Sequence, residues 1–256
     1  METLREKIKN NKQICGTLVA MGEPSVCEMI GHLGYDFIWV DMEHGYISCK
    51  DVFIHANAAR AANTPVIVRL PQNDLTVTKR VLDMGVEGVI FPMVQSAEEM
   101  ETLLSYTLYP PYGCRGFGPQ RAIRYSLDDP WEYTEKGHLE TLRFIQIEHF
   151  NAVKEIERIA ENPYLDGIIF GPNDLSGSIN QLGKVYDPDT TKLIEDTIKV
   201  MKKHNKAIGV ATGSTDEKVL KHWHDMGITM ITSGADYSFL QLGALETLKT
   251  LKNIQK

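Results

Sequence analysis

Short apolar runs alternate with longer amphipathic stretches along almost the whole chain. The runs are rich in β-branched residues and predict strands at Ile14–Val19, Phe37–Asp41, Val66–Arg69, Gly88–Pro92, Arg143–Glu148, Gly167–Phe170, Ala207–Ala211 and Met230–Ser233. The stretches with helical spacing are Ser25–Gly34, Lys50–Ala62, Asp74–Met84, Ser96–Tyr106, Ala152–Ala160, Thr190–His204, Thr215–Met226 and Ala235–Asn253. A strand followed by a helix is therefore the repeating unit.

Strands that are apolar on both faces are typical of a parallel sheet covered by helices. Eight units in 256 residues give about 32 residues per unit, which is the size of a βα repeat in a (β/α)₈ barrel. The alternative is an open doubly wound sheet, but the Gly-x-Gly-x-x-Gly turn that usually follows its first strand is missing after Val19. We therefore predict an α/β protein consisting of a single (β/α)₈ TIM-barrel domain over residues 1–256.

One segment interrupts the repeat, the Pro-, Gly- and Arg-rich stretch Tyr109–Asp129. A loop of this length in a compact domain is usually a lid or an interface element.

Composition and net charge limit the kinds of partner that we expect the protein to bind. The net charge of −7 and the lack of any Lys/Arg cluster argue against nucleic acid or an anionic membrane as the main partner. The N-terminus does not read as a secretory signal, and no apolar run approaches the roughly 20 residues of a membrane span. The four cysteines are scattered, so we expect free thiols and a cytoplasmic location.

Polar side chains gather where the predicted strands end, which is where a barrel of this kind carries its active site. They are Asp41 and His44 after the second strand, Arg69 at the third, Gln146 and Glu148 at the fifth, and Asn173 and Asp174 after the sixth, where they follow Gly171 and Pro172. Glu148 and Asp174 come from adjacent strand ends and form a sparse oxygen site. Such a site suits Mg²⁺ or Mn²⁺, which keep waters and leave positions for a substrate.

Each candidate also has a purely structural interpretation. Arg69 would form an ion pair with Asp41 or Asp83, Asp174 would cap a short turn, and His44 would be an ordinary loop histidine. Their convergence on one end of one barrel favours the functional interpretation.

Lysine is absent from all eight predicted strands. A Schiff-base aldolase needs a desolvated lysine inside the barrel. Carbonyl chemistry at this site would therefore rely on a metal as the electron sink.

Several motifs together resemble the HpcH/HpaI aldolase family. These are Asp41-Met42-Glu43-His44-Gly45, Arg69 with Asn73-Asp74, Phe91-Pro92-Met93-Val94, Tyr109-Pro110-Pro111 with Arg115-Gly116, Gln146-Ile147-Glu148, and Gly171-Pro172-Asn173-Asp174-Leu175-Ser176. The family comprises class II, metal-dependent pyruvate aldolases that act on 2-keto-3-deoxy acids such as 4-hydroxy-2-oxoheptanedioate and 2-keto-3-deoxyglucarate.

The resemblance implies a pyruvate-type TIM barrel in which Glu148 and Asp174 hold a divalent cation (Mg²⁺ or Mn²⁺, with Co²⁺ as a further option). It implies that His44, oriented by Asp41, is the acid/base and that Arg69 holds the keto oxygen. Gln146 and the segment 171–174 would bind substrate. It also implies a homo-oligomer, a hexamer or trimer of dimers, that exchanges its last helix between subunits.

The function that follows is reversible retro-aldol cleavage of a 4-hydroxy-2-oxo acid to pyruvate and an aldehyde, through a metal-stabilised pyruvate enolate. Two enzymatic alternatives use the same site: an oxaloacetate decarboxylase and a lyase acting on acyl-CoA esters. A barrel that only binds a small ketoacid is the non-catalytic alternative.

Overall fold

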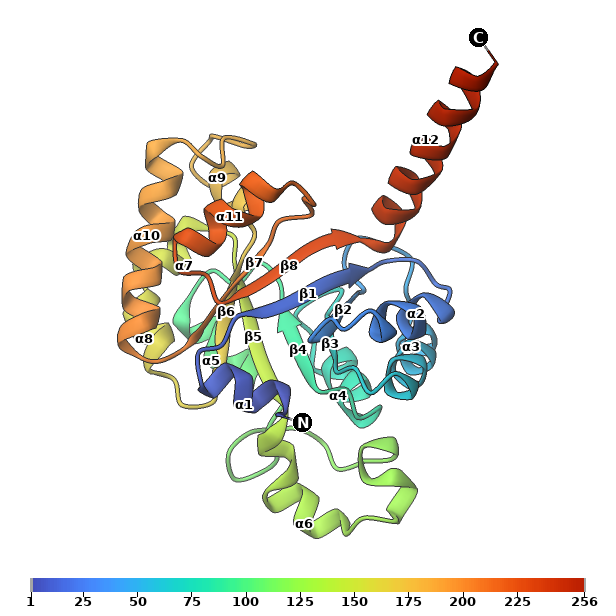
Figure 1. Ribbon diagram of the computed structural model, residues 1–256. Helices are drawn as coiled ribbons and strands as arrows, with labels where there is room; N and C mark the ends of the chain where they lie inside the picture. The colour runs from blue at the N-terminus through green and yellow to red at the C-terminus, as the bar shows by residue number, and fades with distance from the viewer. Residues whose placement is uncertain (1, 256) are drawn as a thin grey trace.

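Eight parallel strands close into a barrel in their order along the chain (Figure 1). The structure is a computed structural model and describes residues 2–255. The strands are β1 (Ile14–Val19), β2 (Phe37–Asp41), β3 (Val66–Arg69), β4 (Gly88–Phe91), β5 (Leu142–Ile147), β6 (Gly167–Phe170), β7 (Ala207–Ala211) and β8 (Met230–Ala235). The predicted (β/α)₈ fold is confirmed, and the strand ends differ from the predicted ones by two residues at most.

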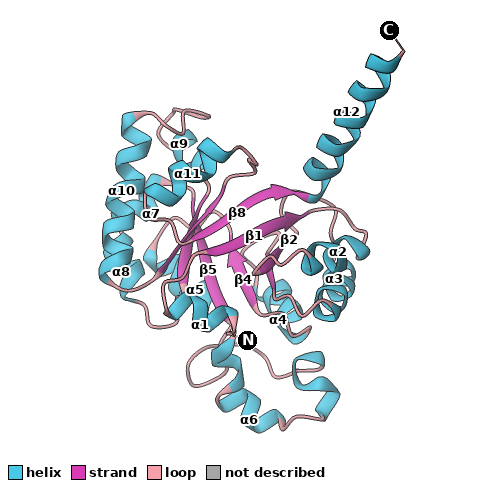
Figure 2. Cartoon of the chain, viewed as in Figure 1, coloured by secondary structure: helices cyan, strands magenta, loops and turns pink. Residues whose placement is uncertain are grey.

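Helices surround the strands (Figure 2). They are α1 (Leu4–Lys9), α2 (Ser25–His32), α3 (Cys49–Ala61), α4 (Leu75–Asp83), α5 (Ala97–Ser105), α6 (Pro130–Glu135), α7 (Phe150–Lys154), α8 (Ile156–Glu161), α9 (Pro172–Gly177), α10 (Pro188–Lys203), α11 (Glu217–Asp225) and α12 (Asp236–Ile254). The short helices α1, α6 and α9 were not predicted, and the helix expected at Ala152–Ala160 is two helices that meet at Glu155. Cap-type residues in the sequence suggested helix starts at Ser25, Asp74, Ser96 and Thr215. Asp74 and Ser96 do cap α4 and α5, but α2 is preceded by Pro24 and α11 is capped by Asp216.

The barrel interior is filled by alternate residues of the strands, because successive side chains of a strand point to opposite faces. Phe37, Trp39, Ile67 and Phe144 belong to the apolar cluster inside the barrel, whereas their strand neighbours pack outward against the helices. Gly16 makes room for this filling, since a Cβ at that position would lie 2.2 Å from the Phe37 ring. Beyond this apolar filling, the last inward-pointing positions at the carboxyl ends of the strands remain for the predicted active site.

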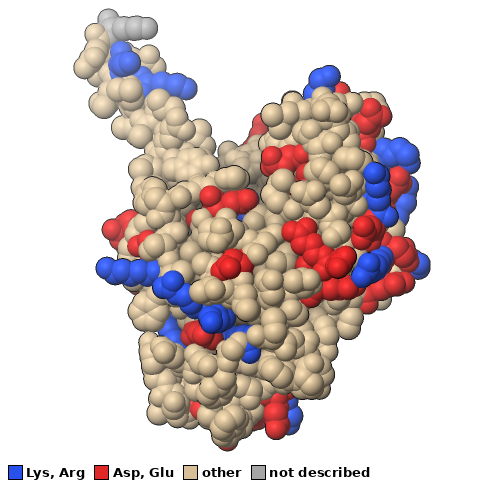
Figure 3. Space-filling model, turned by 180° about the vertical axis from the view of Figure 1, so that it is seen from behind, with Lys and Arg blue, Asp and Glu red and all other residues tan. Residues whose placement is uncertain are grey.

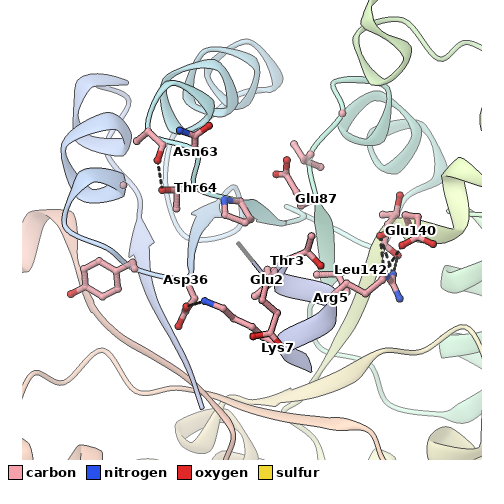
Figure 4. A pocket seen from close by; sticks show the side chains of 18 of the residues that line it. Glu2, Thr3, Arg5, Lys7, Asp36, Asn63, Thr64, Glu87, Glu140 and Leu142 are labelled. Atoms are coloured by element: carbon pink, nitrogen blue, oxygen red, sulfur yellow. Dashed lines mark hydrogen bonds and ion pairs between the residues drawn. The ribbon is translucent and has the colours of Figure 1, made fainter. Parts of the chain in front are cut away.

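The amino end of the barrel is closed by α1, whose Leu4 and Ile8 join the inner apolar cluster. A cavity of about 900 Å³ lies at this end, between the strand starts, α1 and the segment that follows α6 (Figure 4). Four of its charged side chains form pairs, Lys7 with Asp36 and Arg5 with Glu140, and Arg5 also donates to carbonyls of the segment 139–141. This cavity lies at the opposite end of the barrel from the predicted site.

The last helix, α12, stands away from the barrel (Figure 1). Its exposed large apolar side chains are Tyr237, Leu240, Leu242, Leu245, Leu248, Leu251 and Ile254. No helix among residues 2–255 is both long enough and apolar enough to span a bilayer.

Acid should weaken the fold through His55, which is fully buried and donates from Nε2 to the carbonyl of Met21 at 3.0 Å. Burial lowers the pKa of His55. The unfolded chain therefore takes up this proton first as the pH falls below about 6.5, and the free energy of unfolding declines by at most about 1.4 kcal/mol per pH unit from this residue.

Equilibrium denaturation of the parent and of His55→Gln between pH 8 and 5 checks this. Glutamine keeps an N–H donor but does not titrate, so the parent should lose stability relative to the variant only below about pH 6.5. The exposed His32→Gln is the control for loss of one imidazole. A constant difference between parent and His55→Gln over the whole range would contradict the prediction.

Candidate active site

The strand positions that point into the barrel are apolar along most of their length and polar at the carboxyl end. Asp41 follows Trp39 by two residues, Arg69 follows Ile67, and Gln146 and Glu148 follow Phe144 on the same face of β5. All four side chains are buried. The register pairs Asp41 of β2 directly with Arg69 of β3, so the two meet across neighbouring strands. Strand geometry alone therefore brings these four predicted residues to one place.

Arg69 is held in a fixed orientation by three neighbours. Its Nε and Nη2 donate to the two carboxylate oxygens of Asp41 at 2.8 and 2.6 Å. Its Nη1 donates to Gln146 Oε1 at 3.3 Å and lies 2.8 Å from Glu43 Oε2. Burial works against the charge of this guanidinium, but the bonds and charges of Asp41, Glu43 and Glu148 outweigh it and raise the pKa of Arg69. The side chain is therefore a permanent positive charge at the mouth.

Glu148 is a second buried carboxylate of the site, only 4% exposed. Its Oε1 accepts from Gln146 Nε2 at 2.8 Å, and its Oε2 accepts from the backbone N–H of Met93 at 3.0 Å. Met93 adopts a positive φ of 53°, which turns this N–H toward the carboxylate. Burial raises the pKa of Glu148 to about 7; the charges of Glu43 and Asp174 add to the rise, while the Met93 bond and Arg69 oppose it.

Gly171 shapes the space beside this carboxylate. A Cβ at Gly171 would lie 2.2 Å from Glu148 Oε1, so only glycine lets the carboxylate rest against the start of α9. Asp174 is in the first turn of α9 and is exposed, and its charge acts on both Glu148 and Glu43. The predicted residues of the segment 171–174 thus adjoin the buried carboxylate.

The resemblance led us to expect that Asp41 orients His44, but the structure pairs Asp41 with Arg69 instead. Both oxygens of Asp41 are taken by Arg69, and Oδ1 also accepts from the backbone N–H of Glu43. His44 is exposed, and its Nε2 lies 3.8 Å from Glu43 Oε2. The ion pair with Asp41 that we considered as the structural role of Arg69 is therefore present. It contributes to the site by fixing the guanidinium.

Glu43 is the residue that the prediction missed. It belongs to the Asp41–Gly45 motif, and the alternation of a strand that continues past Asp41 puts Glu43 on the same side as Asp41. That spacing was the available signal. Burial raises the pKa of Glu43, and the charges of Asp41 and Asp174 add to the rise, whereas Arg69 and His44 oppose it.

The residues present fit a divalent cation. Asp41, Glu43, Glu148 and Asp174 bring four carboxylates to one mouth, against the single guanidinium of Arg69. Burial raises the pKa of Glu148, and the charges of Glu43 and Asp174 add to the rise, so a negative charge on this carboxylate is unfavourable where it lies. Carboxylate oxygens are the ligands that Mg²⁺ and Mn²⁺ prefer. A cation beside Glu148 would offset the repulsion.

Among residues 2–255, one group of three metal-ligating side chains has all its ligand atoms within 4.8 Å of one another. It consists of Glu157, Glu161 and His204. These lie on α8 and next to α10, and Glu157 is already bonded to Lys203 and His204. This group therefore does not replace the mouth as a cation site.

A closed parallel barrel with an anchored arginine and buried carboxylates at its carboxyl end defines a TIM-barrel enzyme. The sequence profile of the HpcH/HpaI aldolase/citrate lyase family matches residues 16–241. The chain belongs to this family, and its relatives bear the names of aldolases, so it is an enzyme of the aldolase lyase type. The resemblance read from the motifs is confirmed.

Individual relatives cover nearly the whole chain. The 2-dehydro-3,6-dideoxy-6-sulfogluconate aldolase of Pseudomonas putida is 31% identical over 97% of this chain and 96% of its own length. A hydroxypyruvate/pyruvate aldolase of Deinococcus radiodurans is 28% identical over 98% of this chain and 90% of its own. The crystal structure of an HpcH/HpaI aldolase/citrate lyase family protein from Burkholderia cenocepacia superposes with a TM-score of 0.91 at 27% identity, covering 98% of this chain and all of that one.

Removal of the Asp41 carboxylate should destabilise the fold as well as the site. Asp41→Ala leaves the buried Arg69 with only Glu43 and Gln146, and breaking a buried ion pair costs about 3–5 kcal/mol. Chemical denaturation measures the loss. The control is Glu101→Ala, which breaks the exposed pair with Arg158 and should cost about 0–1 kcal/mol. Equal losses in the two variants would contradict the anchoring role of Asp41.

Proposed function

We propose that the protein catalyses the reversible retro-aldol cleavage of a 4-hydroxy-2-oxo acid to pyruvate and an aldehyde, with a divalent cation as cofactor. The observation that carries the proposal is the anchored Arg69 beside the buried carboxylate of Glu148, with Asp174 close enough for its charge to act on that carboxylate. The names of the relatives include pyruvate and hydroxypyruvate as aldolase substrates, which supports a small 2-oxo acid as the nucleophilic half.

Glu148 and Asp174 are the residues that would hold the cation. When bound there, a divalent cation supplies Lewis-acid stabilisation of negative charge on the keto oxygen of the substrate. Gly171 and the bond from Met93 fix the Glu148 carboxylate for this role. The preferred metal is Mg²⁺ or Mn²⁺ on the grounds of the oxygen donor set.

Arg69 binds the same keto oxygen. A guanidinium has five N–H groups. The N–H of Nε and one N–H of Nη2 donate to Asp41, and Nη1 faces Gln146 and Glu43. One N–H of Nη2 thus has no partner among the described residues and is available to the substrate. A donor held in place before the reaction stabilises developing negative charge without reorganising, which is how such groups lower a barrier.

His44 is the proton acceptor for the 4-hydroxyl group. Its side chain is 70% exposed at the mouth, next to Glu43. Loss of the hydroxyl proton to the imidazole lets the C3–C4 bond break, with the electron pair moving toward the keto oxygen beside Arg69. Return of a proton to C3 gives pyruvate, and C4 leaves as the aldehyde. Asn173 and the neighbouring amides at the start of α9 would bind the substrate carboxylate.

Exchange of the pyruvate methyl protons with D₂O, followed by NMR, tests the metal and Arg69 together. Exchange should stop in excess EDTA and return when Mg²⁺ or Mn²⁺ is added. Arg69→Lys should slow it by about two to four orders of magnitude, because lysine cannot reproduce the bidentate bond to Asp41. The exposed Arg158→Lys is the matched control and should exchange like the parent. Exchange that continues unchanged in EDTA would exclude the proposed mechanism.

We also propose that the protein is a homo-oligomer and that α12 packs on a second copy. The helix projects from the barrel and exposes a series of leucines that have no cover in a single chain (Figure 1). Exposed apolar area of this extent usually marks an interface.

Light scattering coupled to gel filtration checks the oligomer. The parent should elute as an assembly of several chains, and the double variant Leu245→Asp/Leu248→Asp should shift toward the single chain, because a charge in an apolar interface is costly. Lys249→Asp, on the same helix, provides the control for an added acidic residue. A parent that elutes as a single chain would refute the proposal.

A further inference from the structure

A second concave site lies on the flank of the barrel, away from the mouth. It is a cavity of about 430 Å³ between α3, α4 and the inserted segment 118–125. Its basic lining residues are Lys50, Arg80 and Arg121, and it shares no residue with the site at the carboxyl end of the barrel. Figure 3 shows a band of Lys and Arg side chains on the side of the molecule where α2, α3 and α4 lie in Figure 1.

Arg121 is the innermost cation of this cavity and is only 6% exposed. Its Nε donates to Asn57 Oδ1 at 2.9 Å and its Nη1 to the carbonyl of Met84, whereas Nη2 has no partner among the described residues. Both partners are neutral groups. Burial and the nearby charge of Arg60 lower the pKa of Arg121 more than the charge of Glu87 raises it, so the positive charge of Arg121 is incompletely compensated.

Lys50 and Arg80 add two more cations, both exposed. Neither takes part in any of the ion pairs found among residues 2–255, in contrast to most surface cations of α10 and α11. The acidic residue of the lining, Asp83, is bound by Arg115 Nη2 at 2.7 Å. The cavity therefore carries a surplus of positive charge in a protein whose net charge is −7.

Apolar walls accompany the charges. The guanidinium carbon of Arg121 lies 5.8 Å from the ring centroid of Phe53, and Tyr125 and Met84 also line the cavity. Walls of low polarity reduce the screening of charges in a concave site, so an anion there would be held more strongly than on a flat surface.

We propose that this cavity is a binding site for a small anion that carries carboxylate or phosphate groups. Lys50 and Arg80 bind it directly, and the charge of Arg121 attracts it from the inner wall. The site is separate from the proposed reaction and does not depend on it. A phosphate group and a dicarboxylate share the required chemistry, and the two probes below distinguish them.

Isothermal titration calorimetry with inorganic phosphate and, separately, with succinate tests the site. The parent should bind at least one of the two probes, and the double variant Lys50→Ala/Arg80→Ala should bind it at least tenfold more weakly. The control is Lys218→Ala/Lys249→Ala, which removes the same charge from α11 and α12 and should bind as the parent does. Arg121 is left in place because it contacts Asn57 and Met84 within the fold.

Thermal unfolding gives a second readout on the same proteins. A ligand that binds only the folded state raises the melting temperature in proportion to its occupancy. The probe that binds should raise it for the parent and the control but not for Lys50→Ala/Arg80→Ala, whose melting temperature without probe reports that it is folded. Three results would overturn the proposal: no binding of either probe to the parent, equal binding to the Lys50→Ala/Arg80→Ala variant, or an equal loss in the control.

Discussion

The guanidinium of Arg69 is the charge around which the mouth of the barrel is arranged. It is buried at the end of β3, and such a group is tolerated only when acceptors surround it. Asp41 supplies two of them through the β2–β3 register, and Gln146 and Glu43 supply the rest. Gln146 in turn donates to Glu148, so the orientation of the arginine and that of the buried carboxylate are set by one hydrogen-bonded chain across three strands.

The same arrangement leaves a charge imbalance. Four carboxylates face one guanidinium, and the pKa of about 7 for Glu148 expresses what burial and repulsion cost when no further positive charge is near. Either a proton or a cation can relieve it. A cation has the advantage for carbonyl chemistry, because it stays at neutral pH and adds a Lewis acid beside a donor that is already oriented. The burial of Glu148 close to other carboxylates is thus the physical reason for expecting a cation there.

The sequence predicted the barrel well because its main signal is simple: eight apolar runs at a regular spacing allow few other folds. It also located Arg69 and Glu148, since strand alternation carries the inward face to the end of each run. The sequence alone does not predict which acceptor each hydrogen-bond donor binds. Asp41 adjoins both His44 and Arg69 in principle, and only the register of two strands decides for Arg69. Glu43 was missed for a similar reason, because its role depends on its ion pair with Arg69, which is 26 residues away in sequence.

The short helices escaped prediction for a different reason. Helices α1, α6 and α9 have six residues each, too few for a periodic pattern. Side chains of Thr3 and Asp129 cap α1 and α6, whereas α9 begins at Pro172 without a side-chain cap. Two of them matter to the chemistry or its support: α9 holds Asp174 beside Glu148, and α1 closes the far end of the barrel with Leu4 and Ile8. The acidic mouth lies at the carboxyl ends of the strands, whereas the flank cavity is lined by α3, α4 and the segment 118–125. The two sites of opposite charge therefore share no residue.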